Sequence, residues 1–308
     1  MNVPVSTSDQ PVTGEGFTPS PARGRILAFD SGIGGLGIVA ALRRRLPDVH
    51  ISYIADTALF PYGEQEDAAL CAHIVALLKD AIDICKPDVV VVACNTASTL
   101  ALGALREACP ETPFVGCVPA IRWAARISRS RVIGLLATRA TVRRPYVDAL
   151  RQQFAPDCTL IAHGARHLAD YAEEAFRGKP PAPHLIEREV AGLFGQPDGD
   201  RIDAVALGCT HYTFLYEALR AASPKHVAWL DPADAVARQT ATVLEAMGPS
   251  LPRHDNTAEH LWFTAPPVDG AELEAHLRPF GYTHAEQWAI PDQERSVSHP
   301  VYEVSDKP

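Results

Sequence analysis

Residues 88–96, DVVVVACNT, and residues 203–211, DAVALGCTH, decide the fold of this chain. Each stretch is an apolar run that ends in a cysteine and is followed at once by small polar residues and a helical pattern. A run that is apolar on both faces is typical of a parallel strand covered by helices on both sides. We therefore predict two buried strands that end in equivalent positions, at Cys94 and at Cys209.

Strand-like and helical segments alternate through most of the chain, which is typical of βαβ units. RILAF at residues 25–29 opens one series, and RVIGLLA at residues 131–137 opens a second. We expect an α/β protein with two similar domains, mainly parallel sheets related by pseudo-twofold symmetry, and an active site in the cleft between them. The predicted parts are a disordered leader (1–23), a first domain (24–118 with 229–295), a second domain (119–228) and a flexible tail (296–308).

Composition and charge exclude several classes of protein. Apolar residues make up 47% of the 308 positions, so the chain can bury sizeable cores. The net charge is -9 and the basic residues are scattered, so we expect no nucleic-acid partner. No apolar stretch approaches the roughly 20 residues that span a bilayer, so we expect no membrane partner and a cytoplasmic location. The seven cysteines include no C-x-x-C pair, which argues for free thiols and against a metal site.

The two strand-end cysteines predict a proton-transfer reaction. Ligands of parallel α/β sheets bind beyond the carboxyl ends of the strands, so Cys94 and Cys209 would meet over one cleft between the halves. Inversion of a carbon centre needs a base on one face and an acid on the other. Two thiols can exchange these roles, and a helix start or polar neighbours can lower a thiol pKa toward neutrality.

Hydrogen-bonding residues follow both cysteines. Asn95, Thr96 and Ser98 come after the first, and Thr210 and His211 come after the second. Together with helix N-terminal amides, such groups can hold carboxylates without a metal. The position of His211, two residues after a candidate catalytic cysteine, predicts a role in handling protons.

The stretch FDSGIGGLG, residues 29–37, also satisfies the dinucleotide-binding pattern G-x-G-x-x-G. Asp56 follows about 24 positions after Gly32, near the place of a ribose-binding carboxylate. Asp30, however, stands where a pyrophosphate would approach and would repel it. We therefore predict that the glycines form a tight turn beside a small ligand, with Asp30 and Ser31 in its wall.

Five motifs follow one another along the chain: FDSGIGGLG (29–37), YIADTALFPYGE (53–64), VVACNTAS (91–98), IGLLATRATV (133–142) and LGCTHY (207–212). In this order they closely resemble the glutamate racemase family of cofactor-independent amino-acid racemases. A sixth stretch, VGCVPAIRWAARI at residues 115–127 followed by a Glu within LADYAEEAFRG, is similar to the proteobacterial branch of that family.

The resemblance implies a role for each matching residue. Cys94 and Cys209 would be the acid/base pair, assisted by Asp30 and His211 respectively, and Glu173 would pair with His211. The residues that would hold the ammonium and the two carboxylates of the substrate, with Asp30 and His211 beside them, are Ser31, Tyr62, Gly63, Asn95, Thr96, Thr138, Thr141 and Thr210.

The resemblance also implies L- or D-glutamate as substrate, no cofactor, and a place in peptidoglycan biosynthesis. A cell-wall precursor as allosteric ligand and a homodimer are further implied expectations. Three alternatives remain open at this point. They are an aspartate racemase or another amino-acid racemase of the same superfamily, a non-enzymatic regulatory protein such as a gyrase-binding scaffold, and a dinucleotide-dependent enzyme.

Overall fold

The computed structural model describes residues 22–248, 253–254, 258–267 and 270–289. The predicted leader up to residue 21 and the predicted tail from residue 296 lie outside the described residues. β1 (Ala22–Arg23), which pairs antiparallel with β10 (Arg253–His254), lies within the range predicted for the leader. A strand of two residues carries no periodic pattern that a sequence could reveal.

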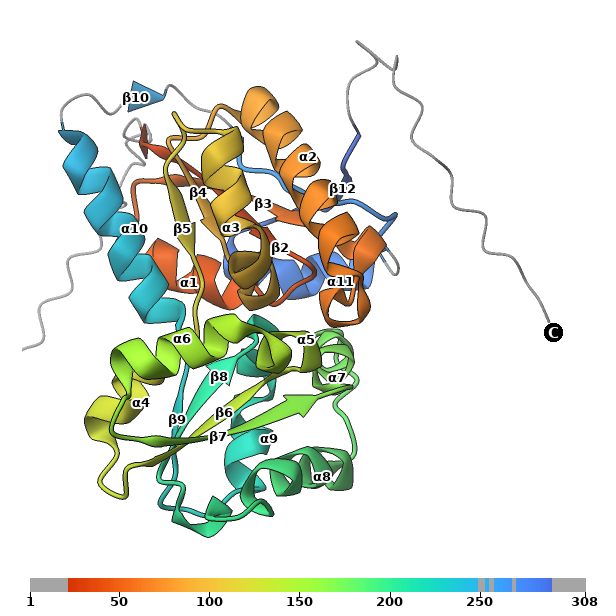
Figure 1. Cartoon of the computed structure of the whole chain (residues 1–308). Helices are drawn as coiled ribbons and strands as arrows, with labels where there is room; N and C mark the ends of the chain where they lie inside the picture. Colours follow the sequence, from red (N-terminus) through yellow and green to blue (C-terminus); the bar gives the residue numbers. More distant parts are fainter. Residues whose placement is uncertain (1–21, 249–252, 255–257, 268–269, 290–308) are drawn as a thin grey trace, which may run out of the picture.

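A parallel sheet of six strands, in the order β12-β11-β3-β2-β4-β5, forms the upper half of the molecule in Figure 1. Helices connect its successive strands, as crossover connections in parallel sheets require. The strands are β2 (Arg25–Asp30), β3 (His50–Ala55), β4 (Val89–Val92), β5 (Phe114–Gly116), β11 (Leu261–Phe263) and β12 (Glu286–Gln287).

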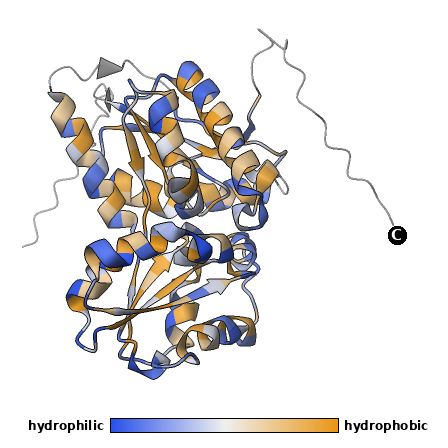
Figure 2. Ribbon diagram, in the orientation of Figure 1, coloured by the Kyte–Doolittle hydropathy of each residue, from blue (hydrophilic) through white to orange (hydrophobic). Residues whose placement is uncertain are grey.

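Side chains of the central strands alternate between the two faces of this sheet. Ile26 and Ala28 pack in one apolar cluster with α1, α10 and α11, whereas Leu27 and Phe29 pack in another with α2 and α3. Figure 2 shows the resulting concentration of apolar residues on the strands. The helices are α1 (Leu36–Arg45), α2 (Asp67–Cys85), α3 (Asn95–Ala108), α10 (Ala233–Met247) and α11 (Gly270–Leu277).

A second parallel sheet, in the order β7-β6-β8-β9, forms the lower half (Figure 1). Its strands are β6 (Val132–Thr138), β7 (Thr159–Ala165), β8 (Ala204–Gly208) and β9 (Ala228–Leu230). The helices around it are α4 (Ile121–Ile127), α5 (Arg139–Arg143), α6 (Pro145–Phe154), α7 (Leu168–Phe176), α8 (Pro183–Phe194) and α9 (Tyr216–Ala221).

The two sheets repeat one arrangement of strands. In the first, β2 lies between β3 and β4, and β5 follows β4; in the second, β6 lies between β7 and β8, and β9 follows β8. The aspartate before each cysteine-bearing strand repeats as well. Asp88 accepts a hydrogen bond from the Arg25 amide, and Asp203 accepts from the amides of Arg129 and Ser130. These correspondences support the predicted duplication of an α/β unit.

Residues 141–154, TVRRPYVDALRQQF, have the sequence pattern of one helix, but two helices, α5 and α6, occupy this region. Arg144 between them has an extended backbone (φ -80°, ψ 139°). Proline at position 145 disfavours a helical conformation at the residue before it and provides a good first residue for a new helix.

The predicted domain boundaries remain a proposal. The chain returns to the first sheet only after β9, whereas the prediction begins that return at residue 229. Residues 229 and 230 lie in this strand, which pairs with β8 of the second sheet. Among the described residues, no helix combines the length and the apolar character needed to cross a membrane.

The Asp203 contacts generate a prediction about stability. Burial alone would raise the pKa of Asp203, but hydrogen bonds from Ser128, Ser130 and Arg129 lower it below its usual value. A lowered pKa in the folded state means that the carboxylate stabilises the fold above its unfolded pKa, about 3.9, and that this contribution disappears as the pH falls. We expect Asp203→Asn to lower the free energy of unfolding at pH 7 by about 1 kcal/mol, since solvent screens part of the interaction.

Urea unfolding at pH 7 and at decreasing pH measures this effect. The difference between the wild type and the Asp203→Asn variant should shrink below about pH 4. The exposed Asp48 provides a control, and Asp48→Asn should change stability little at any pH. A difference for Asp203→Asn that grows as the pH falls would contradict this account.

Candidate active site

Cys94 lies directly after β4 and caps the N-terminus of α3. Its sulfur accepts a hydrogen bond from the Ala97 amide at 3.5 Å and lies 3.9 Å from the Ser31 hydroxyl oxygen. Its side chain is buried, with 5% of the residue exposed. The sequence produces this position because a fully apolar strand ends where the polar residues of a helix start begin.

Cys209 occupies the corresponding place after β8. It precedes a 3-10 helix, Thr210–Leu215, and its sulfur lies 3.9 Å from Nδ1 of His211. The helix predicted to follow Cys209 is therefore a 3-10 turn first, and α9 begins only at Tyr216.

The two cysteines line one cavity of about 20 Å³ between the two sheets. This volume holds about one water molecule and is smaller than an amino acid. Most of the predicted binding residues lie around it. The lining consists of Ser31, Phe60, Pro61, Tyr62, Gly63, Cys94, Asn95, Thr96, Thr138, Ala169, Cys209, Thr210 and His211.

Three predicted residues, Asp30, Thr141 and Glu173, lie behind this lining. The Asp30 carboxylate is fully buried at the end of β2 and accepts hydrogen bonds from the Gly32 amide at 3.0 Å and from the Thr210 hydroxyl at 2.7 Å. Thr141 is fully buried too, and its hydroxyl contacts the hydroxyl of Thr138 at 3.0 Å. These residues can shape and polarise the cavity, but they do not form its surface.

Glu173 and His211, both from the second half of the molecule, form a buried ion pair. Oε1 of Glu173 lies 3.2 Å from Nε2 of His211 and accepts a hydrogen bond from the Ile33 amide at 2.8 Å. Oε2 of Glu173 also contacts Arg177 at 3.0 Å. On its other side, Nδ1 of His211 lies 4.0 Å from Asp30, so the imidazole stands between two carboxylates.

These contacts set the protonation of the pair. Burial lowers the pKa of His211, but the Cys209 sulfur, Glu173 and Asp30 outweigh it and raise this pKa well above its usual value. Burial would raise the pKa of Glu173, but His211, the Ile33 amide and Arg177 lower it. At neutral pH the structure therefore holds an imidazolium against a carboxylate, next to the Cys209 sulfur.

The expectation that a helix start lowers the thiol pKa is wrong for Cys94. Burial raises the pKa of the Cys94 thiol far above its usual value, and the nearby Asp30 carboxylate raises it further. The hydrogen bonds from the Ala97 amide and Ser31 oppose this rise only in part. Cys94 is therefore a neutral thiol in this state, ready to donate a proton.

Asn95 provides a sign that the cavity takes a ligand. Both polar atoms of its side chain are buried without a hydrogen-bond partner among the described residues. Such groups are rare and costly in folded proteins unless a ligand or water satisfies them. Nearby, the hydroxyl oxygens of Thr96 and Thr138 lie 3.4 Å apart and add further hydrogen-bonding capacity.

The glycine turn is required by side chains of the second half of the molecule. A Cβ added at Gly32 would collide with Glu173 and His211, and one added at Gly34 would collide with His211. The space over this turn, which a pyrophosphate would need, is therefore occupied by a carboxylate and an imidazole. This finding argues against the dinucleotide-binding alternative.

Sequence reasoning missed three residues that line the cavity, Phe60, Pro61 and Ala169. The Phe60 ring lies against the imidazole of His211, with ring centroids 5.3 Å apart. The available signal was the position of Phe60 and Pro61 directly before Tyr62, within a motif whose later residues were assigned to the site.

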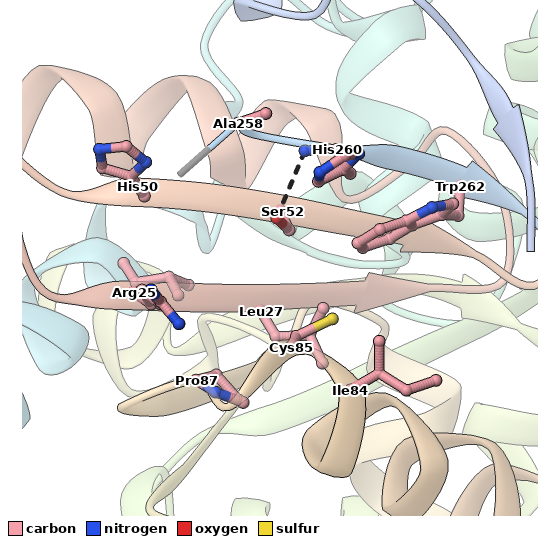
Figure 3. Close-up of a pocket in the computed structure, with 11 residues that line it drawn as sticks. Arg25, Leu27, His50, Ser52, Ile84, Cys85, Pro87, Ala258, His260 and Trp262 are labelled. Atoms are coloured by element: carbon pink, nitrogen blue, oxygen red, sulfur yellow. Dashed lines mark hydrogen bonds between the residues drawn. The ribbon is translucent and has the colours of Figure 1, made fainter. Parts of the chain in front are cut away.

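Another cavity, of about 250 Å³, lies by the amino ends of strands of the first sheet, away from the strand ends that carry Cys94 (Figure 3). Arg25, His50 and Ser52 line it near the amino ends of β2 and β3, together with Cys85 and Trp262. It contains none of the predicted site residues. Its position at the amino ends of the strands is also unusual for a ligand site in a parallel sheet.

Comparison with known proteins finds glutamate racemases among the relatives of this chain. Residues 37–240 match the Asp/Glu/Hydantoin racemase family. A glutamate racemase of Granulibacter bethesdensis is 56% identical over 218 residues, which cover 71% of this chain and 78% of that protein. A glutamate racemase of Brucella anthropi is 47% identical over 220 residues, covering 71% and 79%. The crystal structure of Escherichia coli glutamate racemase with L-glutamate and the activator UDP-MurNAc-ala has a TM-score of 0.80 and 35% identity, covering 87% of this chain and 99% of that one.

The buried ion pair generates a prediction about His211. Glu173→Gln removes the negative charge beside Nε2 but keeps a similar shape, so it should lower the pKa of His211. Titration of ¹⁵N-labelled histidine by NMR measures this pKa. Glu189→Gln is a matched control, because Glu189 forms the same kind of contact with His163, at 2.9 Å, in another part of the second domain. An unchanged His211 pKa in the Glu173→Gln variant would contradict the charge pairing.

Proposed function

Because the chain belongs to the Asp/Glu/Hydantoin racemase family, we propose that it is a glutamate racemase, an isomerase that interconverts L-glutamate and D-glutamate. One observation carries this proposal. Cys94 and Cys209 line the same small cavity from equivalent strand ends of two repeated α/β units. A thiol on each side of a small cavity is the arrangement that inversion of one carbon centre requires.

The reaction is a proton exchange at the α-carbon. The thiolate of one cysteine removes the α-proton from one face, and the thiol of the other donates a proton to the opposite face. The product has the inverted configuration, and the two sulfurs have exchanged their protonation states. His211 stands 3.9 Å from the Cys209 sulfur and assists on that side, whereas Asp30 assists on the side of Cys94.

Polar groups of the cavity hold the substrate between the sulfurs. Asn95 satisfies its unpartnered amide on the ligand, and the Thr96 and Thr138 hydroxyls together with the N-terminal amides of α3 bind carboxylate oxygens. Ser31, Tyr62, Gly63 and Thr210 complete the wall, with Thr141 behind it. Fixed donors of this kind stabilise the negative charge that develops when the α-proton leaves.

The small volume of the cavity bears on how the substrate is activated. An α-proton is far less acidic than a thiol, so the site must lower the barrier by orientation and by exclusion of water. A cavity of about 20 Å³ cannot admit glutamate. The two domains therefore separate to admit the substrate and close over it.

The cellular setting follows from the proposed activity. The reaction supplies D-glutamate for peptidoglycan biosynthesis in the cytoplasm and needs no cofactor, nucleic acid or membrane. A cell-wall precursor regulates the enzyme, in line with the activator bound in the Escherichia coli structure. The assembly is a homodimer, which sedimentation of the purified protein tests.

Replacement of either cysteine tests the function. We expect Cys94→Ser and Cys209→Ser each to lower racemisation of both glutamate enantiomers by about 10²–10⁴-fold, because each removes one proton carrier. Circular dichroism of L-glutamate, D-glutamate and L-aspartate solutions measures the rates. Cys158→Ala is the control, since Cys158 is buried in the second domain and does not line the cavity.

Wild-type protein in deuterated water provides the complementary test. Because each face has its own proton donor, deuterium should appear mainly in the inverted product and little in recovered substrate. Preferred turnover of aspartate would overturn the assigned substrate. Full activity in either serine variant would overturn the two-thiol mechanism, and absence of any racemisation would favour a regulatory protein.

A further inference from the structure

Asp56 is a buried carboxylate that the proposed reaction does not use. It follows β3, is fully buried, and its amide donates a hydrogen bond at 2.8 Å to the carbonyl of Asp30 at the end of the neighbouring strand. The dinucleotide pattern would place it on a ribose, but its side chain is occupied by groups of this chain. It therefore has another role.

Three side chains from three separate segments bind the Asp56 carboxylate. Oδ2 accepts a hydrogen bond from the Tyr62 hydroxyl and lies 2.8 Å from Nε2 of His73 on α2. Oδ1 accepts from the hydroxyl of Thr264, after β11, at 2.7 Å. Both oxygens are thus in use, and the carboxylate joins the cavity wall to a helix and to the sheet.

This network keeps Asp56 ionised despite its burial. Burial would raise its pKa, but the hydrogen bond and charge of His73, with the hydroxyls of Tyr62 and Thr264, lower it below the usual value. Tyr62 shows the opposite shift, because burial and the Asp56 charge raise its pKa well above normal. Tyr62 is therefore a neutral phenol whose single hydroxyl proton points to Asp56, so it cannot donate that proton to a ligand.

The same network holds the segment that carries Phe60 and Tyr62. The Thr264 hydroxyl, which donates a hydrogen bond to Asp56, also accepts one from the Ala58 amide at 3.0 Å. The Thr57 hydroxyl accepts a hydrogen bond from the Ala265 amide at 3.2 Å. The residues of this segment that reach the cavity are Phe60, Pro61, Tyr62 and Gly63. Asp56 and Thr264 thus hold this wall of the cavity in place through hydrogen bonds on the side that faces away from the cavity.

We propose that Asp56, anchored by His73, is a positioning residue that sets the Phe60–Gly63 wall against the substrate through the Tyr62 hydroxyl. This inference rests on the proposed racemase function and assigns no substrate contact to Asp56 or to His73. A displaced wall would turn the α-carbon away from the line between the two sulfurs, so the loss falls on kcat. Displacements of about 1 Å can lower rates by about 10²-fold.

His73 permits a clean test because its side chain is 36% exposed, so its replacement leaves no buried cavity. His73→Leu removes the donor to Asp56 and should lower kcat at least tenfold, with a smaller change in KM. His73→Gln restores an N–H donor at a similar distance and should recover most of the lost kcat. His184→Leu, an exposed histidine on α8, is the matched control and should retain the wild-type rate.

A double-mutant cycle tests the link to the wall. Asp56→Asn should lower kcat by about 10–100-fold, and Tyr62→Phe should add little further loss in the Asp56→Asn background, because both act through one hydrogen bond. Additive losses would overturn the proposal. So would a His73→Leu variant that unfolds at a lower temperature but keeps the wild-type kcat, since that result shows a structural role alone.

The failure of this inference and the failure of the proposed function give different results. Racemisation of glutamate by the wild-type protein is measured first. If the wild type is active and the His73→Leu and Asp56→Asn variants match its kcat, the positioning role is wrong while the function stands. If the wild type racemises no amino acid, the function is wrong, and with it the inference that rests on it.

Discussion

The whole arrangement depends on a buried carboxylate at the end of one central strand, that of Asp30. It accepts hydrogen bonds from its own turn, through the Gly32 amide, and from the other half of the molecule, through the Thr210 hydroxyl. Burial raises the pKa of this carboxyl, and the charge of His211 with the hydrogen bonds of Thr210, Gly32 and Ser31 opposes the rise only in part. An ionised carboxylate in a buried position is costly unless donors surround it. Because its donors come from both halves of the molecule, the ionised form is stabilised most when the two halves lie against each other.

That carboxylate makes the two sides of a repeated fold electrostatically different. Cys94 lies near Asp30, whose negative charge together with burial disfavours a thiolate there. Cys209 lies beside His211, which is held as an imidazolium by Glu173 and Asp30. The two halves repeat the same order of strands, but the residues that follow the corresponding strands differ. Duplication thus provides two opposed thiols, and divergence of their neighbours provides a distinct environment for each.

Much of this could be predicted because it depends on local pattern. Fully apolar runs specify buried strands, and the repeated run ending in cysteine places Cys94 and Cys209 at equivalent positions. What the sequence could not show depends on contacts between residues far apart in the chain. The role of Asp56 is one example, because its partners include His73 on α2 and Thr264 after β11.

The pKa of Cys94 could not be predicted for the same reason. A helix start is visible in the sequence, but complete burial and the neighbouring Asp30 outweigh it, and both come from tertiary packing. The break between α5 and α6 is a different case. Proline 145 was a local signal for it, and the continuous apolar pattern around the proline concealed its effect.

The unequal environments of the two thiols are limited by thermodynamics. L-glutamate and D-glutamate have the same free energy in water, so the ratio kcat/KM of a glutamate racemase must be equal in the two directions, whatever the asymmetry of its site. The His211 and Asp30 environments can therefore make kcat for one enantiomer differ from kcat for the other only if the two KM values differ by the same factor. The same transition state connects both enantiomers, so a change at either cysteine raises one barrier that both directions share. A site built from one carboxylate side and one imidazolium side is thus compatible with balanced racemisation. Its asymmetry sets the relative populations of the two protonation states of the free protein, and each of these states accepts one enantiomer.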